Sequence, residues 1–429
     1  MKIKALIISA AIIATQAAQA ATFSKFYLNS KTHDQLWLSA IAENAAAQEI
    51  KEQAFSTLLP NIKLGLANSL NQTNNDTIDS HSASITLQQA LYNSALFAAD
   101  NKAKKIASKA DLILQKAKND LLIRAANAYF NALYAQDALN FAQAENTSLK
   151  TQLEQEKRKL EVGVANITDV LEVQARFDAS EARLISAQDN VHSAMDEIEI
   201  MVPDFDGQLN SLKHNVFDSP IEDINTDFQI EIAKKNNLDI LIAQDDLIMA
   251  ENDVQIDESG HLPTINLLGK SQAQQIDGLS ANDHSISLNM EMPLYSGGMV
   301  SSKVKAAKLR KVAAGKKLKH IERQTVKAVK DSIRRINSSF NKIKALKSAV
   351  ASAEQMRNSI ALGITVGTRT LSDLLDSEST VLKSKENLAR AMYDHIIILI
   401  NFENANGQLQ EDIIYSIDEL LEENKNEKI

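Results

Sequence analysis

The chain has 429 residues, a formal net charge of −9 and no cysteine, and only 5% of its residues are aromatic. Without cysteine it can have neither a disulfide framework nor a lipid anchor on a cysteine. The acidic balance disfavours nucleic-acid binding, which requires positive charge. The low aromatic content, together with only 5 prolines, favours long helices over large mixed cores.

The first residues, 1–20, have the pattern of a secretory signal peptide. Lys2 and Lys4 precede an apolar stretch that ends at the small-residue cleavage site Ala18-Gln19-Ala20. The stretch is too short to span a membrane as a helix. We therefore expect an exported chain whose mature part begins at Ala21.

The remaining sequence repeats itself at a nearly fixed offset. Leu59-Pro60 recurs 203 positions later as Leu262-Pro263, and Val162-Gly163 recurs 204 positions later as Val366-Gly367. Matched landmarks at offsets that differ by only one residue indicate a duplicated supersecondary unit. We expect a first repeat over 21–202, an inter-repeat segment over 203–225, a second repeat over 226–408 and an acidic C-terminal tail over 409–429.

Each repeat is expected to contain a helix and then two strands with apolar and polar residues in alternation. The strands are predicted at about 61–71 and 82–92, and at about 264–271 and 285–294. About ten residues suffice for a tilted strand to cross a bilayer. The alternation fits either a sheet on a soluble core or a membrane barrel with a polar lumen.

A membrane barrel could not close within one chain, because the smallest known barrels have about eight strands. The barrel would have to be shared, with eight strands from two copies or twelve from three. Strand counting alone does not choose between them.

Two histidines, His81 and His284, are expected in equivalent loops next to the strands. Neither has a second histidine or a carboxylate at ligand spacing, so no metal site is predicted there. The sequence also has no nucleophile elbow and no glycine-rich phosphate loop. We therefore expect neither an enzyme nor a cofactor.

A long α-helical hairpin is expected after each strand pair, at about 95–202 and 299–406. Apolar and alanine positions recur with a mean spacing of 3.5 residues, which is typical of a coiled-coil seam. The first arm would span roughly 95 Å at 1.5 Å per residue. Nothing in a globular domain requires helices of this length.

The two hairpin turns restart a helix with a capping residue followed three positions later by an acid. Asn166 precedes Asp169, and Thr370 precedes Asp373. Such an acid stabilises its own helix, so both carboxylates have a purely structural explanation. Asp376 lies one turn further along the same helix face, where no cap requires it.

At these turns and at the strand ends the chain resembles the TolC family of outer-membrane efflux and secretion ducts. The resemblance runs from about Lys31 to Gly407. It is carried by four motifs in order: Ile167-Thr168-Asp169-Val170, Gly260-His261-Leu262-Pro263, Leu294-Tyr295-Ser296-Gly297-Gly298-Met299-Val300 and Val366-Gly367-Thr368-Arg369-Thr370.

The resemblance implies a homotrimer with a 12-stranded β-barrel in the outer membrane of a Gram-negative bacterium. A 12-helix α-barrel of coiled-coil hairpins would continue it through the periplasm. The implied function is a passive exit duct for tripartite efflux pumps, type I protein secretion or both. Its implied partners are a periplasmic adaptor (membrane fusion protein), an inner-membrane pump of RND, ABC or MFS type, and outer-membrane lipid.

The resemblance also assigns the gate to the helical tips. Asp373 and Asp376 would ring the periplasmic constriction, where three chains would gather six carboxylates and polyvalent cations would block the channel. Arg369 would act as a latch by bonding to Thr168 and Asp169 on a neighbouring helix pair.

Two glycines and one isoleucine complete the prediction for the tips. Gly163 and Gly367 would lie where the adaptor docks. The family has a tyrosine in the latch network at the position of Ile364, so one polar contact of the closed state is missing here.

Two other functions fit parts of the pattern: a periplasmic coiled-coil adaptor and a structural protein built from long helices. An adaptor would have one hairpin and a lipoyl-like β-domain between its helices. A structural protein would not need strands with a polar lumen face.

Overall fold

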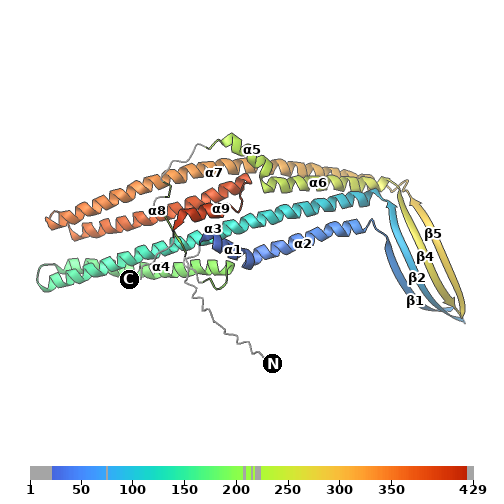
Figure 1. Ribbon diagram of the computed structural model, residues 1–429, viewed down its shortest axis with the longest axis horizontal. Coiled ribbons are helices and arrows are strands. Elements are labelled where there is room, and N and C mark those ends of the chain that lie inside the picture. Colours follow the sequence, from blue (N-terminus) through green and yellow to red (C-terminus); the bar gives the residue numbers. More distant parts are fainter. Residues whose placement is uncertain (1–21, 74–75, 206–208, 214–215, 218–223, 423–429) are drawn as a thin grey trace, which may run out of the picture.

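The computed structural model describes residues 22–73, 76–205, 209–213, 216–217 and 224–422, so the expected signal peptide at 1–20 lies outside the described residues. Figure 1 shows an elongated molecule with a β-sheet at one end and the turns of two helical hairpins at the other. The sheet and the hairpin turns, which contain the predicted functional residues, therefore lie at opposite ends of the molecule.

The order of the elements displays the duplication. The first repeat consists of α1 (Phe23–His33), α2 (Gln35–Ser56), β1 (Asn61–Thr73), β2 (Asp76–Tyr92), α3 (Ser94–Glu161) and α4 (Ile167–Met201). The second consists of α5 (Thr226–Asn236), α6 (Leu238–Glu258), a 3-10 turn (Ser259–His261), β4 (Thr264–Ile276), β5 (Leu279–Glu291), α7 (Met299–Thr365) and α8 (Leu371–Asn406). Between the repeats lies β3 (Ser211–Leu212), and α9 (Ile413–Leu420) and β6 (Leu421–Glu422) follow the second repeat.

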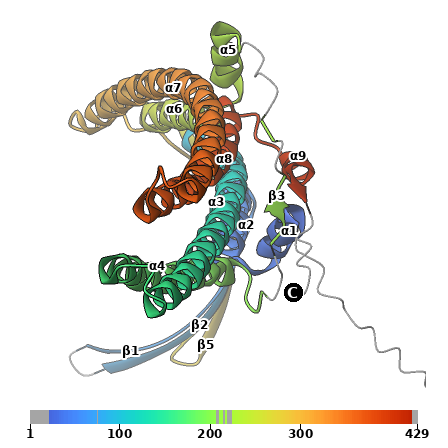
Figure 2. The same cartoon turned by 90° about the vertical axis from the view of Figure 1, so that its left-hand side faces the viewer.

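The long helices lie side by side in a curved layer. In the half nearest the sheet, α3 packs between α2 and α6, and α6 packs on α7; towards the tips, α3 packs on α4 and α8, and α8 packs on α7. Figure 2 shows this layer as an arc, with α1, α5 and α9 outside its convex side. The coiled-coil seam explains the close packing, since Ala125, Ala128 and Ala132 of α3 are all buried.

None of the helices within the described residues has the length and apolar character needed to cross a membrane.

The four long strands form one antiparallel sheet in the order β1-β2-β4-β5. Paired residues share a face, and Ile62, opposite Leu87, and Leu64, opposite Ile85, belong to the apolar face. On the same face Gly269 lies opposite both Leu87 and Ile286. This face is uncovered within the chain, because the side chain of Ile62 is 69% exposed and that of Ile286 is 85% exposed.

The strand limits differ from those predicted. Strand β2 begins at Asp76 instead of about 82, β4 continues to Ile276, and β5 covers Leu279–Glu291 instead of about 285–294. The second hairpin closes through two residues, Asp277 and Gly278, both with positive φ. This turn type matches the twist of the strands, so pairing continues to the end of the hairpin.

The expected loop positions of the two histidines are therefore wrong. His81 lies within β2 opposite Asn68, and His284 lies within β5 opposite Ser271. The Ser271 hydroxyl is 2.9 Å from Nδ1 of His284. Both histidines lie on the face of the apolar side chains. His81 is four positions from Ile85 on its strand and His284 is two positions from Ile286, and side chains an even number of positions apart share a face.

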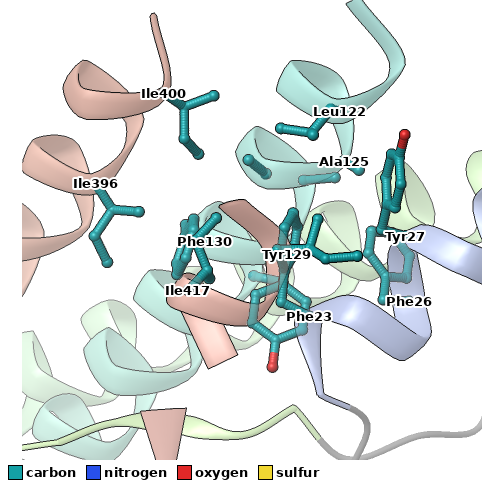
Figure 3. Packing of buried hydrophobic residues seen from close by; sticks show 14 of the residues in the cluster. Phe23, Phe26, Tyr27, Leu122, Ala125, Tyr129, Phe130, Ile396, Ile400 and Ile417 are labelled. Carbon is teal, nitrogen blue, oxygen red and sulfur yellow. The ribbon is translucent and has the colours of Figure 1, made fainter. Parts of the chain in front are cut away.

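The largest buried cluster lies at the middle of the molecule, and we call it the waist core. It joins α1, α3, α8 and α9 through fully buried aromatic rings, such as Phe23, Phe26 and Phe130. Figure 3 shows Ile396 and Ile417 close to Phe130. Aromatic rings bury more area than other side chains, so a few of them stabilise this junction.

The first part of the predicted C-terminal tail belongs to the waist core. Ile414, Ile417 and Leu421 are buried there, and β6 pairs with β3. The acidic composition of the segment concealed its amphipathic helix α9. The prediction of a tail from residue 409 is therefore wrong as far as residue 422, and residues 423–429 lie outside the described range.

Candidate functional site

The two helical tips have nearly the same backbone. Helix α3 ends before Gly163, which has φ of +74°, and α7 ends before Gly367, which has φ of +77°. The amide of each glycine donates to a carbonyl of its helix, at 3.0 Å from Leu160 and 3.0 Å from Ile364. The left-handed conformation favours glycine, which explains why both turns contain it.

Both tips also carry the predicted cap. The Asp373 carboxylate accepts the backbone N–H of Thr370 at 3.0 Å, and the Asp373 N–H donates to the Thr370 hydroxyl at 3.2 Å. Asp169 accepts the backbone N–H of Asn166 at 3.4 Å. Hydrogen bonds from the backbone and the side chain of Thr370 lower the pKa of Asp373. The structural role of the two acids is thus observed at both tips.

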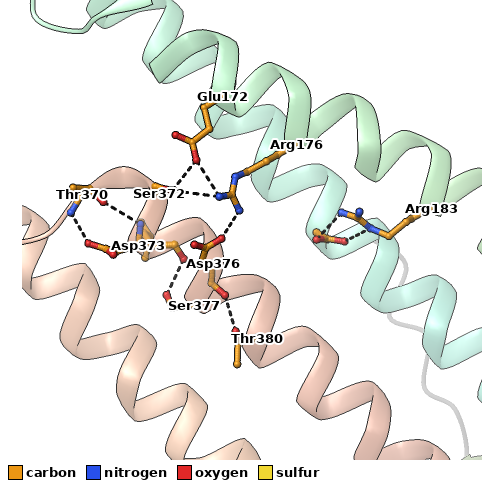
Figure 4. Close-up of polar contacts among 11 residues, drawn as sticks. Glu172, Arg176, Arg183, Thr370, Ser372, Asp373, Asp376, Ser377 and Thr380 are labelled. Carbon is orange, nitrogen blue, oxygen red and sulfur yellow. Dashed lines mark hydrogen bonds and ion pairs between the residues drawn. The ribbon is translucent and has the colours of Figure 1, made fainter. Parts of the chain in front are cut away.

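Asp376 has a different environment, because an arginine from the other hairpin binds it. Nη1 of Arg176 in α4 donates to Oδ1 of Asp376 in α8 at 2.6 Å. Nη2 of the same arginine is 3.0 Å from Glu172 Oε1 and 3.3 Å from Ser372 Oγ. The Ser372 hydroxyl donates to Glu172 at 2.7 Å. Figure 4 shows these four side chains between the two hairpins.

We call this group of four residues, Glu172, Arg176, Ser372 and Asp376, the tip fork. Partial burial opposes the charge of Arg176, but hydrogen bonds to Asp376 and Glu172 outweigh it and raise the pKa of the guanidinium. Arg176 and Ser372 were not predicted from the sequence. The available signal was the spacing of four between Glu172 and Arg176, which predicts a salt bridge on one helix face.

An apolar cluster adjoins the tip fork and joins its two helices, α4 and α8, to α3. Leu149 and Leu153 of α3, Val170 and Val173 of α4 and Leu375 of α8 are all buried in it. Leu375 precedes Asp376 directly, so the cluster fixes the place of the carboxylate. The two hairpins of one chain are therefore in contact close to their tips.

The predicted latch is not formed within one chain. No hydrogen bond or ion pair joins Arg369 to Thr168 or Asp169, although all three residues lie in the described part of the chain. The aliphatic part of Arg369 lies against Gly363, where an added Cβ would come 2.6 Å from the Arg369 Cγ.

Among the described residues, no three histidine or acidic side chains converge in a way that would hold a metal ion. The two carboxylates assigned to the constriction have separate environments, because Asp373 caps its own helix and Asp376 binds Arg176. Within one chain they do not form a shared ligand set.

The sequence matches the model of a known protein family over both repeats. A model of the outer membrane efflux protein family covers residues 32–200 and 229–408. The chain belongs to this family. The predicted resemblance to the TolC family is thereby confirmed.

Several relatives bear the name outer membrane protein TolC. The protein of Vibrio cholerae serotype O1 is 31% identical over 427 residues, which cover 97% of this chain and 98% of that protein. The protein of Salmonella enteritidis is 31% identical over 423 residues, with 94% and 85% coverage. The alkaline protease secretion protein AprF of Pseudomonas aeruginosa is 27% identical over 325 residues, with 74% and 68% coverage.

A solved structure supports the fold independently. The channel protein CusC superposes with a TM-score of 0.79 at 14% identity, covering 90% of this chain and 92% of that chain. The predicted fold class, helical hairpins that continue a strand domain, is confirmed. The chain is an outer-membrane exit duct of the efflux and secretion type, as predicted. A periplasmic adaptor or a structural protein is not favoured.

Proposed function

We propose that three copies of the chain form one passive duct. The observation that carries the proposal is the unpaired edge on each side of the four-stranded sheet, at β1 and at β5. Unpaired backbone groups cannot remain in lipid, so the barrel must close with strands from other copies. Two copies would give eight strands, whose interior is just filled by side chains, whereas twelve strands leave a lumen.

The lateral helices support the same assembly. Helices α2, α3, α6 and α7 form a row in that order, so α2 and α7 lie at its two ends. Both expose large apolar side chains within the chain: Leu36, Leu38, Ile41, Ile50 and Phe55 on α2, and Leu309 and Val312 on α7. Another copy would bury part of these faces. Sedimentation of the detergent-solubilised chain should give the mass of three chains, and a two-chain mass would contradict the proposal.

The helical tips are the periplasmic gate of this duct. Asp373 and Asp376 of the three copies ring the constriction, and Arg369 of one copy bonds to Thr168 and Asp169 of the next. The exposed position of Asp376, the partly exposed position of Asp373 and the absence of an ion pair at Arg369 in the described residues support this arrangement. A ring of carboxylates concentrates cations in a narrow pore.

The turns at Gly163 and Gly367 are the docking points for a periplasmic adaptor. Val162 and Val164 at the first turn and Val366 at the second are 74%, 77% and 72% exposed, which suits contact with a partner. The adaptor connects the duct to an inner-membrane pump of RND, ABC or MFS type. The pump supplies the energy, so the chain itself catalyses no reaction.

The gate is tested by the double variant Asp373→Ala, Asp376→Ala. Polyvalent cations added on the periplasmic side should block single-channel conductance of the wild-type chain in planar bilayers. The double variant should lose the block, because the carboxylate ring is gone. An unchanged block would show that the constriction lies elsewhere.

The pump that uses the duct determines which cargo passes through it. The related protein AprF is named for secretion of an alkaline protease, and the family is named for efflux. We therefore expect small toxic compounds, secreted proteins or both. Deletion of the gene, followed by parallel measurements of drug susceptibility and protein secretion, separates these classes; a strain unchanged in both would contradict the proposed function.

A further inference from the structure

The tip fork breaks the symmetry of the internal repeat. At the offset of 204, Glu172 corresponds to Asp376, and Arg176 corresponds to Thr380. The Thr380 hydroxyl donates to the backbone carbonyl of Asp376 at 2.7 Å and carries no charge. Arg176 therefore lies between two acids, Glu172 and Asp376, that occupy equivalent positions in the two repeats. The second repeat has an uncharged residue where the first has Arg176.

The geometry of Arg176 suits this bridging role. Its two terminal nitrogens bind acids on different hairpins, Asp376 on α8 and Glu172 on α4. A guanidinium is planar and presents its donors in a fixed fork, so both contacts hold at once only while α8 stays beside α4. Ser372 closes the arrangement from the α8 side by bonding to Glu172.

The two carboxylates of α8 consequently differ in charge environment. Asp373 is bound to the Thr370 cap and has no ion pair among the described contacts, whereas Asp376 is directly opposed by a guanidinium. Separation of α8 from α4 would leave the cap intact and break the bond to Arg176. The guanidinium of Arg176 thus makes the electrostatic potential at Asp376 less negative while the hairpins are together, and this effect weakens when the hairpins move apart.

We infer that Arg176 sets the charge of the constriction and pins the two hairpins of one chain together at the tip. This inference rests on the proposed gate at Asp373 and Asp376. Arg176 acts through Asp376, so it is a positioning residue. The consequence is that the attraction of the constriction for cations increases as the tips separate.

The test compares Arg176→Gln with Arg183→Gln. Arg183 is two turns further along α4 and forms a bidentate pair with Glu145 at 3.1 and 2.9 Å, within one hairpin. Its removal deletes the same charge and an arginine–carboxylate pair without breaking an ion pair between the hairpins. Both variants are measured as the full mature chain in planar bilayers, with La³⁺ added on the periplasmic side.

Arg176→Gln should change two readouts. La³⁺ should bind about tenfold more tightly, since an unopposed carboxylate about 8 Å from a trivalent ion contributes roughly that factor in water. The ratio of open to closed channels should rise about fivefold, because an exposed ion pair stabilises the closed state by up to about that factor. Arg183→Gln should leave both readouts unchanged, and Arg176→Lys should retain the wild-type La³⁺ affinity.

The double variant Arg176→Gln, Asp376→Asn separates charge from pinning. It removes one positive and one negative group, so La³⁺ affinity should return to within about twofold of the wild type. The contact between hairpins stays broken, so the open fraction should stay high. If the double variant behaves like Asp376→Asn alone, Arg176 does not set the charge.

Failure of this inference can be told apart from failure of the proposed gate. If Asp373→Ala, Asp376→Ala loses the La³⁺ block while Arg176→Gln matches Arg183→Gln, only the role of Arg176 is overturned. If the double alanine variant keeps the block, the gate itself is overturned, and the inference falls with it. Equal recovery of heat-resistant assemblies for all variants shows that folding is preserved.

Discussion

The waist core and the helical tips are stabilised by different means. At the waist, aromatic rings of α1 and α3 are fully buried, as Phe26 and Phe130 are. At the tips, two glycine turns are exposed, and the contacts that join the hairpins include the tip fork, one small apolar cluster and the hydrogen bonds of Ser148 and Gln152 to Glu378. The difference indicates that the waist supplies the stability of the fold, while the tips retain contacts weak enough to break during function.

The largest expected effect comes from removing a ring at the waist. Phe130 stacks on Phe23 at 6.0 Å and meets Tyr129 edge-on at 5.6 Å. Phe130→Ala should lower the free energy of unfolding by about 3 to 5 kcal/mol, because it leaves a cavity in a packed cluster. The midpoint of thermal unfolding of the purified chain measures this loss.

The matched control for Phe130→Ala is Ile185→Ala on α4, whose side chain is 66% exposed. It should change the free energy of unfolding by less than about 0.5 kcal/mol. Equal effects of the two substitutions would show that the waist core is not the main source of stability.

Two glycines with the same backbone conformation compare the regions more directly. Gly407 ends α8 next to the waist core with φ of +71°, and an added Cβ would lie 2.3 Å from the carbonyl oxygen of Asn236. Gly367 at the tip has φ of +77°, and no atom lies within 4 Å of an added Cβ. Gly407→Ala should cost about 3 kcal/mol and Gly367→Ala about 1 kcal/mol of unfolding free energy. A larger cost at Gly367 would reverse the comparison.

A smaller, pH-dependent effect is expected at His395 on α8. Its ring is buried beside Phe217 at 4.7 Å, and its Nδ1 is 2.7 Å from the Ser339 hydroxyl. Burial lowers the pKa of His395 below its ordinary value. As the pH falls, His395 is therefore protonated at a higher pH in the unfolded chain than in the folded chain. The free energy of unfolding should decrease as the pH drops below about 6.5.

The pH effect is measured from melting temperatures of the wild type and His395→Gln at pH 8 and pH 5.5. The wild type should lose more stability than the variant between these values, because only the wild type has a buried imidazole to protonate. Parallel pH profiles would show that other groups dominate this range.

Local patterns predicted the features that depend on neighbouring residues. The seam of alanines such as Ala125 and Ala128 predicted packed long helices, and the glycine turns at Gly163 and Gly367 follow from backbone conformation alone. The extent of the strands was missed, since the polar residues around Asp277 conceal a two-residue turn. Attention to the Asp-Gly pair could have corrected this from the sequence.

The site was predicted only in part for a related reason. Asp373 and Asp376 were distinguished by their spacing from the cap, but the partner of Asp376 is 200 residues away in the chain. Arg176 has an ordinary structural explanation as the helical partner of Glu172, so its second contact is invisible to local reasoning. Contacts between separate hairpins depend on how the helices pack.

The sequence by itself determined the duplication, the strand and helix types and the family, because periodicity, motifs and their recurrence can be read along the chain without knowledge of its packing. Only the tertiary structure decided that the segment from 409 to 422 joins the waist core and that Arg176 opposes Asp376. Each depends on long-range packing, in which segments distant in the chain meet and a charge acquires its partner.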